Sequence, residues 1–518
     1  MISIIPEPVR LELKYGKFIL DTACVVAADP GAVEIAEGFV RSLVPALGIE
    51  YVVFPEPPQG KYKPLWLRLD PALTNLGSEG YHLQVAPDRV ELAAAEPAGL
   101  FYATQTLRQL FPPEIFSQTP VSGVVWAIPC VEIEDYPRFP WRGAMLDVCR
   151  HFMPKDFILK YIDLLALHKC NTLHWHLTED QGWRIQILKY PRLTEVGAWR
   201  NGTVVGQGDE ESTYFAYDNI SHGGFYTQED AREVVEYAKS RFVRVVPEIE
   251  MPGHCQAAIA AYPELGNTGK QLEVCKHWGI IEAVFNVEES TIRFLQDVLD
   301  EVMEIFPSPF IHVGGDEVPK KEWKGSPTAQ KRMRELGLKD EEELQSYFTR
   351  RMDAFLAGRG RRLIGWDEIL EGGLAPGAAV MSWRGEEGGI TAANAGHDVV
   401  MAPYQYLYLN TPQIQEDTHR KSGNYLPLEK VYRYDPMPAA IDPARAQHVL
   451  GAQAELWSES IGDPQRMEYM SFPRLCALAE AAWTPLERKN YGDFKSRLQN
   501  HLSRLDGLKV NYCKKIDD

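Results

Sequence analysis

The 518-residue sequence lacks several features that would place it in a specialised class. Its eight cysteines are scattered and form no C-x-x-C pair, which is typical of a mostly reduced protein and not of a disulfide framework. Cys255 and Cys275 are the only two that we consider as a pair, and we expect them to stay apart. No stretch is apolar enough to span a membrane, and no repeat or low-complexity tract occurs.

The net charge is strongly negative, but the charged residues are not clustered along the chain. The formal net charge is -18 and the pI about 5.3, yet no long run of like charge is present. This balance argues against a nucleic-acid or anionic-membrane partner and favours an acidic globular enzyme, which we expect to be a monomer or homodimer.

The first residues, MISIIPEPVRLELKYGK, contain only a short apolar stretch that is interrupted by Pro6, Glu7 and Pro8. This stretch is too short for a signal peptide. We therefore expect a cytoplasmic protein, or a secreted one if a signal peptide has been removed.

Residues 1–135 have the pattern of a small α+β domain. Alternating apolar and polar residues on both sides of a Pro-Asp turn predict a β-hairpin over 81–95. Apolar residues at helical spacing predict a helix over 98–111, which Pro112 and Pro113 end.

Residues 136–518 show a different rhythm, in which short apolar runs alternate with amphipathic helices. One predicted helix has Thr227 as its N-cap, and another ends at Gly358. Eight runs are predicted to be strands: 142–148, 172–177, 243–249, 310–315, 362–366, 378–383, 398–403 and 448–457. This alternation predicts a (β/α)8 TIM barrel that includes the C-terminal helix. A doubly wound sheet is less consistent, because no G-x-G-x-x-G or phosphate loop is present.

Polar and aromatic residues gather where the predicted strands end, the edge at which such barrels carry their active sites. The residues are Asp147, Arg150, His151, His174, His176, Glu179, Asp180, Glu248, Glu250, His254, Asp316, Glu317, Trp366, Asp367, Trp383, Arg384, Tyr404, Tyr406, Tyr408, Asn410, Trp457 and Glu459. A single strand-end histidine or tryptophan is usually packing, but this whole set indicates a site. Tryptophan faces and charged groups in one pocket are typical of carbohydrate binding.

Two alternatives stay open at this point. His174 and His176 lie on one face of a strand, and with His254 and carboxylates they could form the centre of a metal-dependent hydrolase. The lack of a further histidine at a later strand end weakens that reading. A non-catalytic carbohydrate-binding barrel is the other, and it would require a missing acid. Arg150 could hydrogen-bond two sugar hydroxyls or form a salt bridge with Asp147.

With these residues in hand, the chain resembles glycoside hydrolase family 20, the bacterial β-N-acetylhexosaminidases. The motifs that carry the resemblance are, in the family's order, RGAMLDVCRHFMP, NTLHWHLTEDQGWR, GGFYTQED, VVPEIEMPGH, FIHVGGDEV, GWDEIL, MSWRG and ELWSE. They cover nearly the whole barrel, and residues 1–135 resemble the α+β domain that precedes the barrel in many members.

The resemblance implies a role for each matching residue. The implied catalytic residues are Glu317 as general acid/base, Asp316 as the carboxylate that orients the 2-acetamido group, Tyr408 as a hydroxyl on the acetamido oxygen, and the relay of Glu179 and His254. The implied substrate-binding residues are Trp366, Trp383 and Trp457 as pocket walls, Arg150 and Glu459 as readers of hydroxyls, Asn410, and Asp180. Asp180 and Glu250 are the neighbours of the relay. No metal or other cofactor is implied.

Three positions depart from the family's usual pattern. Many relatives carry Asp where this chain has Glu179 and Glu250, so the geometry of the relay is less certain than the acid itself. Asn410 stands where many relatives have Asp, which leaves the preference between sugar epimers open.

Asp316 and Glu317 are neighbours and cannot easily flank a glycosidic bond, as the two carboxylates of most glycosidases do. The resemblance implies substrate assistance instead, in which the 2-acetamido oxygen is the nucleophile. We expect a retaining exo-β-N-acetylhexosaminidase that removes terminal β-linked GlcNAc from a glycan or glycoconjugate, with Glu317 protonated and Asp316 ionised at rest. Activity on GalNAc, and the related lacto-N-biosidase and sulfated-GlcNAc hydrolase activities, stay open.

Overall fold

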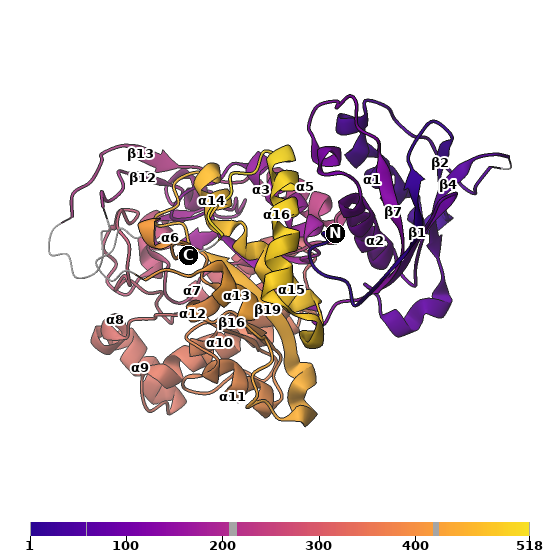
Figure 1. Ribbon diagram of the computed structural model, residues 1–518. Helices are drawn as coiled ribbons and strands as arrows, with labels where there is room; N and C mark the ends of the chain where they lie inside the picture. The colour runs from indigo at the N-terminus through magenta and orange to yellow at the C-terminus, as the bar shows by residue number, and fades with distance from the viewer. Residues whose placement is uncertain (1, 59, 207–214, 418–423, 517–518) are drawn as a thin grey trace.

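The computed structural model describes residues 2–58, 60–206, 215–417 and 424–516. An N-terminal sheet with its helices stands beside a closed barrel, and Figure 1 shows the sheet in indigo to purple at one side of the molecule. No helix in these described ranges is long and apolar enough to cross a membrane.

The N-terminal sheet has seven strands in the order β1-β7-β5-β6-β4-β2-β3. Their bounds are β1 Arg10–Ile19, β2 Cys24–Ala28, β3 Val53–Phe54, β4 Lys63–Leu69, β5 Tyr81–Ala86, β6 Arg89–Ala94 and β7 Ala127–Asp135. Strands β5 and β6 form an antiparallel hairpin, which confirms the prediction for 81–95. The predicted helix is also confirmed as α2 (Pro97–Leu110), and α1 (Val33–Leu47) packs beside it.

The barrel is closed by eight parallel strands in the order β14-β15-β16-β17-β18-β19-β8-β9, which confirms the predicted (β/α)8 fold. The strands are β8 Trp141–Asp147, β9 Thr172–His176, β14 Arg244–Glu248, β15 Phe310–His312, β16 Arg362–Trp366, β17 Ala379–Ser382, β18 Val399–Met401 and β19 Val449–Leu456. Each overlaps one predicted run. Strand β15 ends earlier than predicted, before Gly314 and Gly315, whose positive φ angles of 66° and 93° lie outside the usual range of an extended strand.

The helices between the strands form the outer layer. They are α3 Lys155–Leu167, α4 Arg192–Glu195, α5 Gln228–Lys239, α6 Gln256–Ala261, α7 Glu289–Ile305, α8 Lys321–Gly325, α9 Pro327–Leu336, α10 Glu341–Ala357, α11 Glu387–Ala395, α12 Tyr404–Leu407, α13 Leu428–Arg433, α14 Pro464–Ser471, α15 Arg474–Trp483 and α16 Tyr491–Gly507. Helix α5 begins as predicted: the Thr227 hydroxyl accepts from the Asp230 backbone N–H, and the Asp230 carboxylate accepts from the Thr227 N–H. Two short hairpins, β10 Thr178–Glu179 with β11 Gly182–Trp183 and β12 Trp199–Asn201 with β13 Ser221–Gly223, follow β9.

The inside of the barrel has an apolar part and a polar layer. The register pairs Asp147 with His176, His176 with Glu248, and Glu248 with His312, so these four residues from β8, β9, β14 and β15 lie at one level. Because these positions come from separate segments of the chain, only the closed sheet brings them together.

The N-terminal sheet is joined to the barrel by buried ion pairs. Lys169 Nζ lies 2.7 Å from Asp135 Oδ2, and both side chains are fully buried. Arg142 of β8 pairs with Glu79 at 2.8 Å. Helix α16, yellow in Figure 1, lies between the two parts, and its Arg504 donates to the Gln109 carbonyl oxygen. The boundary between residues 135 and 136 stays a prediction.

The eight cysteines all lie in described segments, and all are free and buried. Cys255 and Cys275 are unpaired, in line with the expectation that they stay apart.

Candidate active site

Asp316 and Glu317 lie in the turn that follows β15. Glu317 has a φ of 49°, in the left-handed region that non-glycine residues seldom adopt. The Asp316 side chain is only 11% exposed, whereas that of Glu317 is 33% exposed. The two neighbours therefore face different surroundings, one buried and one open to solvent.

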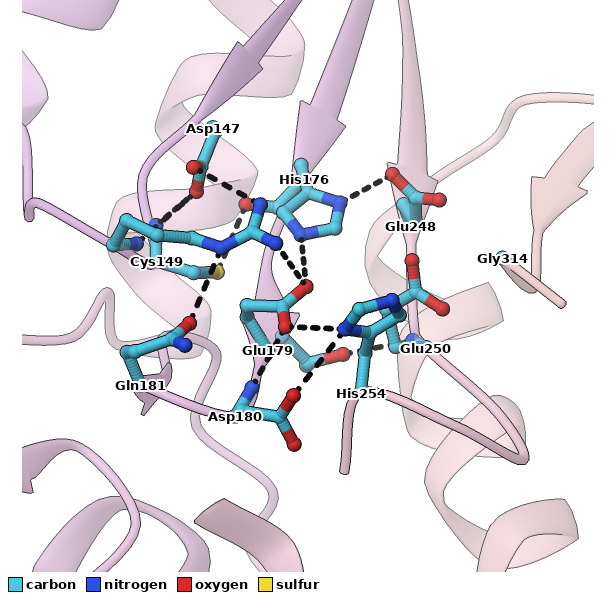
Figure 2. A network of polar contacts seen from close by, with 12 residues as sticks. Asp147, Cys149, His176, Glu179, Asp180, Gln181, Glu248, Glu250, His254 and Gly314 are labelled. Atoms are coloured by element: carbon cyan, nitrogen blue, oxygen red, sulfur yellow. Dashed lines mark hydrogen bonds and ion pairs between the residues drawn. The ribbon is translucent and has the colours of Figure 1, made fainter. Parts of the chain in front are cut away.

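His254 connects this pair to the residues behind it. Its Nε2 atom lies 3.6 Å from Asp316 Oδ2 and 3.5 Å from Glu317 Oε2. Its Nδ1 atom lies 2.8 Å from Glu179 Oε1 and 3.2 Å from Asp180 Oδ2, as Figure 2 shows. Burial alone would lower the pKa of His254, but the charges of Glu179 and Asp316 outweigh it and raise this pKa well above its usual value. His254 is therefore an imidazolium ion between two sets of carboxylates.

The structure thus brings together Glu179, Asp180, His254, Asp316 and Glu317, all of which the sequence placed in the site. Their roles in a reaction stay predictions.

Arg150 contacts the carboxylate oxygen of Glu179 that His254 does not. Its Nη2 atom lies 3.3 Å from Glu179 Oε2, and its Nη1 atom lies 3.3 Å from Asp147 Oδ2. The salt bridge with Asp147, one of the two alternatives for Arg150, is therefore present. Burial would raise the pKa of Glu179, but Arg150 and His254 lower it far below its usual value. The Arg150 guanidinium also lies 5.0 Å from the centre of the Trp457 ring. The other alternative, in which Arg150 hydrogen-bonds two sugar hydroxyls, stays a prediction.

Glu248 is the centre of a buried network whose arrangement the sequence did not predict. Its carboxylate contacts three imidazoles and one indole: His176 Nδ1 by a short contact, His174 Nε2 at 3.0 Å, His312 Nδ1 at 2.7 Å and Trp366 Nε1 at 2.9 Å. His176 Nε2 lies 3.2 Å from Glu179 Oε2, so this network continues to the relay. Burial lowers the pKa of His174 to about 4, whereas Glu248 and Glu179 overcome the effect of burial and raise that of His176 to about 10.

This network bears on the metal alternative. The expectation that no later strand supplies a further histidine is wrong, because His312 stands on β15. The sequence argument missed it, because residues of one barrel layer are matched by strand register and not by spacing along the chain. Each of the three imidazoles places one ring nitrogen against the Glu248 carboxylate, and His174, Glu248 and His312 lie close enough together to hold a metal ion, so the metal alternative stays open.

Aromatic rings line the other side of the site. Trp383 stacks on Tyr408 with ring centres 6.0 Å apart, and Tyr408 lies 6.2 Å from Trp457. Trp366 lies 5.7 Å from Trp457 but is only 1% exposed, so it forms a floor beneath the pocket instead of an open wall. Burial, with the charge of Glu455, raises the pKa of Tyr408 well above its usual value and keeps its hydroxyl protonated as a donor.

Several buried acceptor atoms of the described residues face no partner, and two of them belong to residues assigned to the site. Within the described part of the chain, Asp316 Oδ1 and Asn410 Oδ1 have no hydrogen-bond donor. Unpaired buried acceptors are costly, and in a site they indicate atoms that await a ligand.

Two hollows open on opposite sides of the barrel mouth. One, of about 360 Å³, is lined by Glu317, Glu368 and Arg384 among others, and the other, of about 330 Å³, by Glu459, His151 and Trp278 among others. Glu368 is a further residue that the sequence did not single out. It accepts a hydrogen bond from Trp383 Nε1 at 2.9 Å, and burial, with the charge of Asp316, raises its pKa to about 8. Its only sequence signal is its position two residues after Trp366.

Comparison with known proteins identifies the family. Residues 139–486 match glycosyl hydrolase family 20, catalytic domain, and residues 1–136 match glycosyl hydrolase family 20, domain 2. The chain belongs to glycosyl hydrolase family 20. The twelve residues assigned to the site lie between Arg150 and Glu459, inside the segment that matches the family 20 catalytic domain.

Relatives in family 20 align over nearly the whole chain. A β-hexosaminidase of Porphyromonas gingivalis is 46% identical over 99% of this chain, which spans 64% of that protein's length. The crystal structure of a family 20 exo β-N-acetylglucosaminidase of Vibrio harveyi, in complex with N-acetylglucosamine, has a TM-score of 0.86 and 34% identity, over 99% of this chain and 78% of its own. The family 20 β-N-acetylhexosaminidase of Streptomyces coelicolor has a TM-score of 0.85 and 30% identity, over 99% and 98% of the two chains.

Proposed function

We propose that this chain is a retaining exo-β-N-acetylhexosaminidase that hydrolyses terminal β-linked GlcNAc by substrate-assisted catalysis. Membership of family 20 and the activities of its relatives support a β-hexosaminidase. The proposed ligand is the non-reducing end of a glycan or glycoconjugate, and the mechanism uses no cofactor.

One observation carries the mechanistic part of the proposal. Asp316 and Glu317 both approach the same nitrogen of His254, at 3.6 and 3.5 Å. Carboxylates that share one imidazole edge do not stand on opposite faces of a sugar ring, where an acid and a protein nucleophile would have to be. The nucleophile is therefore expected from the substrate.

The first step breaks the glycosidic bond. The carbonyl oxygen of the 2-acetamido group attacks the anomeric carbon, the bond to the leaving oxygen breaks, and Glu317 donates its proton to that oxygen. Because the nucleophile is tethered to the sugar, the step has the advantage of an intramolecular reaction. The product is a bicyclic oxazolinium ion whose positive charge is shared with the former amide nitrogen.

In the second step Glu317 removes a proton from water, which attacks the anomeric carbon and opens the oxazolinium ring. Two displacements at the same carbon retain its configuration. Tyr408 would donate its hydroxyl hydrogen to the acetamido oxygen and hold it in position, while Trp383 and Trp457 would pack against the sugar.

Asp316 is assigned to the developing positive charge. The sequence argument expected it to be ionised at rest, yet burial raises its pKa to about 7, opposed by His254 and reinforced by Glu317. Asp316 is therefore only partly ionised at neutral pH in the free protein. Positive charge on the substrate nitrogen, beside the unpaired Asp316 Oδ1, would favour its carboxylate form, so ionisation and catalysis are coupled.

A panel of aryl glycosides tests the proposal. We expect rapid release of the aryl group from β-GlcNAc, and turnover of β-glucoside and β-galactoside that is lower by at least about 10³-fold, because these sugars lack the tethered nucleophile. β-GalNAc in the same panel measures the epimer preference that Asn410 leaves open. 6-Sulfo-β-GlcNAc tests the sulfated-sugar alternative, and an aryl lacto-N-bioside tests disaccharide release. Dialysis against a chelator is expected to leave the GlcNAc rate unchanged.

Comparable rates on β-GlcNAc and β-glucoside would contradict substrate assistance while leaving a glycosidase activity in place. Loss of activity on chelation, restored by a divalent metal, would support the metal-dependent alternative instead.

A further inference from the structure

Glu250 has a buried carboxyl group that no contact in the site satisfies. The residue is only 2% exposed, and its backbone N–H donates to Thr178 Oγ1 at 2.8 Å. Both of its carboxyl oxygens, by contrast, have no hydrogen-bond partner among the residues that the structure describes. Figure 2 shows this carboxyl between Glu248 and His254, below the polar layer of the barrel.

The Glu250 side chain fits in the fold because residue 314 is a glycine. A Cβ atom added to Gly314 would lie 1.7 Å from Glu250 Oε2, so only glycine is compatible with the observed position. Gly314 also has a φ of 66°, which other residues adopt at a cost. The turn that carries Asp316 and Glu317 therefore begins near a glycine that leaves space for the Glu250 carboxyl group.

The charges around Glu250 are mostly negative. The facing titratable groups come from four segments: Glu248 on β14, Glu179 on β10, Asp316 after β15 and His254 after β14, with His176 on β9 behind Glu248. His254 is the only cation among those that act directly on Glu250, and it already contacts Glu179 and Asp180. Among the described residues Glu250 has no cationic partner of its own, unlike Glu248, so the ionisation of its buried carboxyl is strongly disfavoured.

We propose that Glu250 is a neutral carboxylic acid in the resting protein, and that its neutrality lowers the cost of ionising Asp316. Because a neutral Glu250 adds no charge next to Asp316, the single ionisation available in this part of the pocket is left to Asp316. The proposal rests on the proposed function for the role of Asp316, but the protonation of Glu250 does not.

The effects on the pKa agree with this geometry. Burial, followed by Asp316 and Glu248, raises the pKa of Glu250 well above its usual value, with His254 opposing. Glu179, which is buried to the same degree but pairs with Arg150 and His254, has its pKa lowered. The two buried glutamates therefore differ in expected charge, because Glu250 is neutral and Glu179 is negative.

The test compares Glu250→Gln with Glu179→Gln in the whole protein. The infrared difference spectrum between the wild type and Glu250→Gln at pH 7 is expected to show the carbonyl stretch of one protonated buried carboxyl, because the bands of Glu368 and Asp316 are shared by both proteins and cancel. The difference spectrum between the wild type and Glu179→Gln is expected to lack it. Glu250→Gln should keep kcat for aryl β-GlcNAc within about threefold, because the amide is also neutral and of similar shape. The acidic limb of the pH profile of kcat/KM for Glu250→Gln should stay near that of the wild type. Glu179→Gln should lower kcat by about 100-fold or more, because it removes the anion that holds an imidazolium in place.

Several results would overturn the proposal. A spectrum of Glu250→Gln identical to that of the wild type would show that Glu250 is ionised. A loss of kcat as large as that of Glu179→Gln would show that the carboxyl group of Glu250, and not its neutrality, is required. If Glu250→Gln does not fold, Glu250→Met gives the same two readouts with another neutral side chain. Failure of the wild type to cleave aryl β-GlcNAc would contradict the proposed function alone, because the infrared result does not depend on turnover.

Discussion

Replacing Glu317 by glutamine is expected to lower kcat for chitobiose by about 10²–10⁴-fold, the usual contribution of a general acid. Glutamine has no proton to give to the leaving oxygen, so substrates with poor leaving groups should suffer most. Aryl glycosides with strongly acidic phenols should lose much less in the first step. Steady-state kinetics on chitobiose and on a series of aryl β-GlcNAc substrates measure this difference.

Glu335→Gln is a matched control for this experiment. Glu335 is an exposed residue of α9, where it pairs only with Lys331 at 3.6 Å, so this variant should have the activity of the wild type. Unimpaired hydrolysis of chitobiose by Glu317→Gln would show that another residue supplies the proton. Glu368, which lines the same hollow and has a raised pKa, would then be the first candidate.

Replacing Asp316 by asparagine is expected to lower kcat for aryl β-GlcNAc by about 10²–10³-fold, because it removes the charge that stabilises the oxazolinium-like transition state. The same variant should change the pH profile. The carboxylate is the form assigned to catalysis and its pKa is raised to about 7, so wild-type kcat/KM should fall as the pH drops below about 7. Asp316→Asn should lack this dependence, since the amide does not titrate.

Asp300→Asn is the corresponding control, because Asp300 pairs with Arg359 on the surface, 43% exposed and outside the barrel mouth. A pH profile of Asp316→Asn with the same acidic limb as the wild type would assign that limb to another group. A kcat close to that of the wild type would remove Asp316 from the account of charge stabilisation.

The barrel could be predicted from sequence because its parallel strands are buried on both faces. The run 362–366 is apolar after Arg362, and it became β16 with the predicted bounds. Where the prediction was too long, at 310–315, the cause is local backbone geometry. Gly314 and Gly315 have positive φ angles, which sequence alone does not specify for a glycine that follows an apolar run.

The identity of the site residues was easier to predict than the contacts that they make with one another. His254, Glu179 and Asp316 follow strands, and all strand ends of a barrel meet at one edge, so their proximity follows from the fold. The grouping of His312 with Glu248 depends on register between strands, which the sequence pattern does not contain. The depth of Trp366 and the partial protonation of Asp316 depend on burial, which requires the packed structure.

The central claim is that the 2-acetamido oxygen of the substrate is the nucleophile. The most direct measurement is kcat/KM for aryl β-glycosides that carry N-acetyl, N-fluoroacetyl, N-difluoroacetyl and N-trifluoroacetyl groups and share one leaving group. Fluorine withdraws electrons from the amide oxygen and weakens its attack on the anomeric carbon, so kcat/KM should fall steeply with each fluorine. A value that does not change across the series would contradict the claim and would require a nucleophile from the protein or from water.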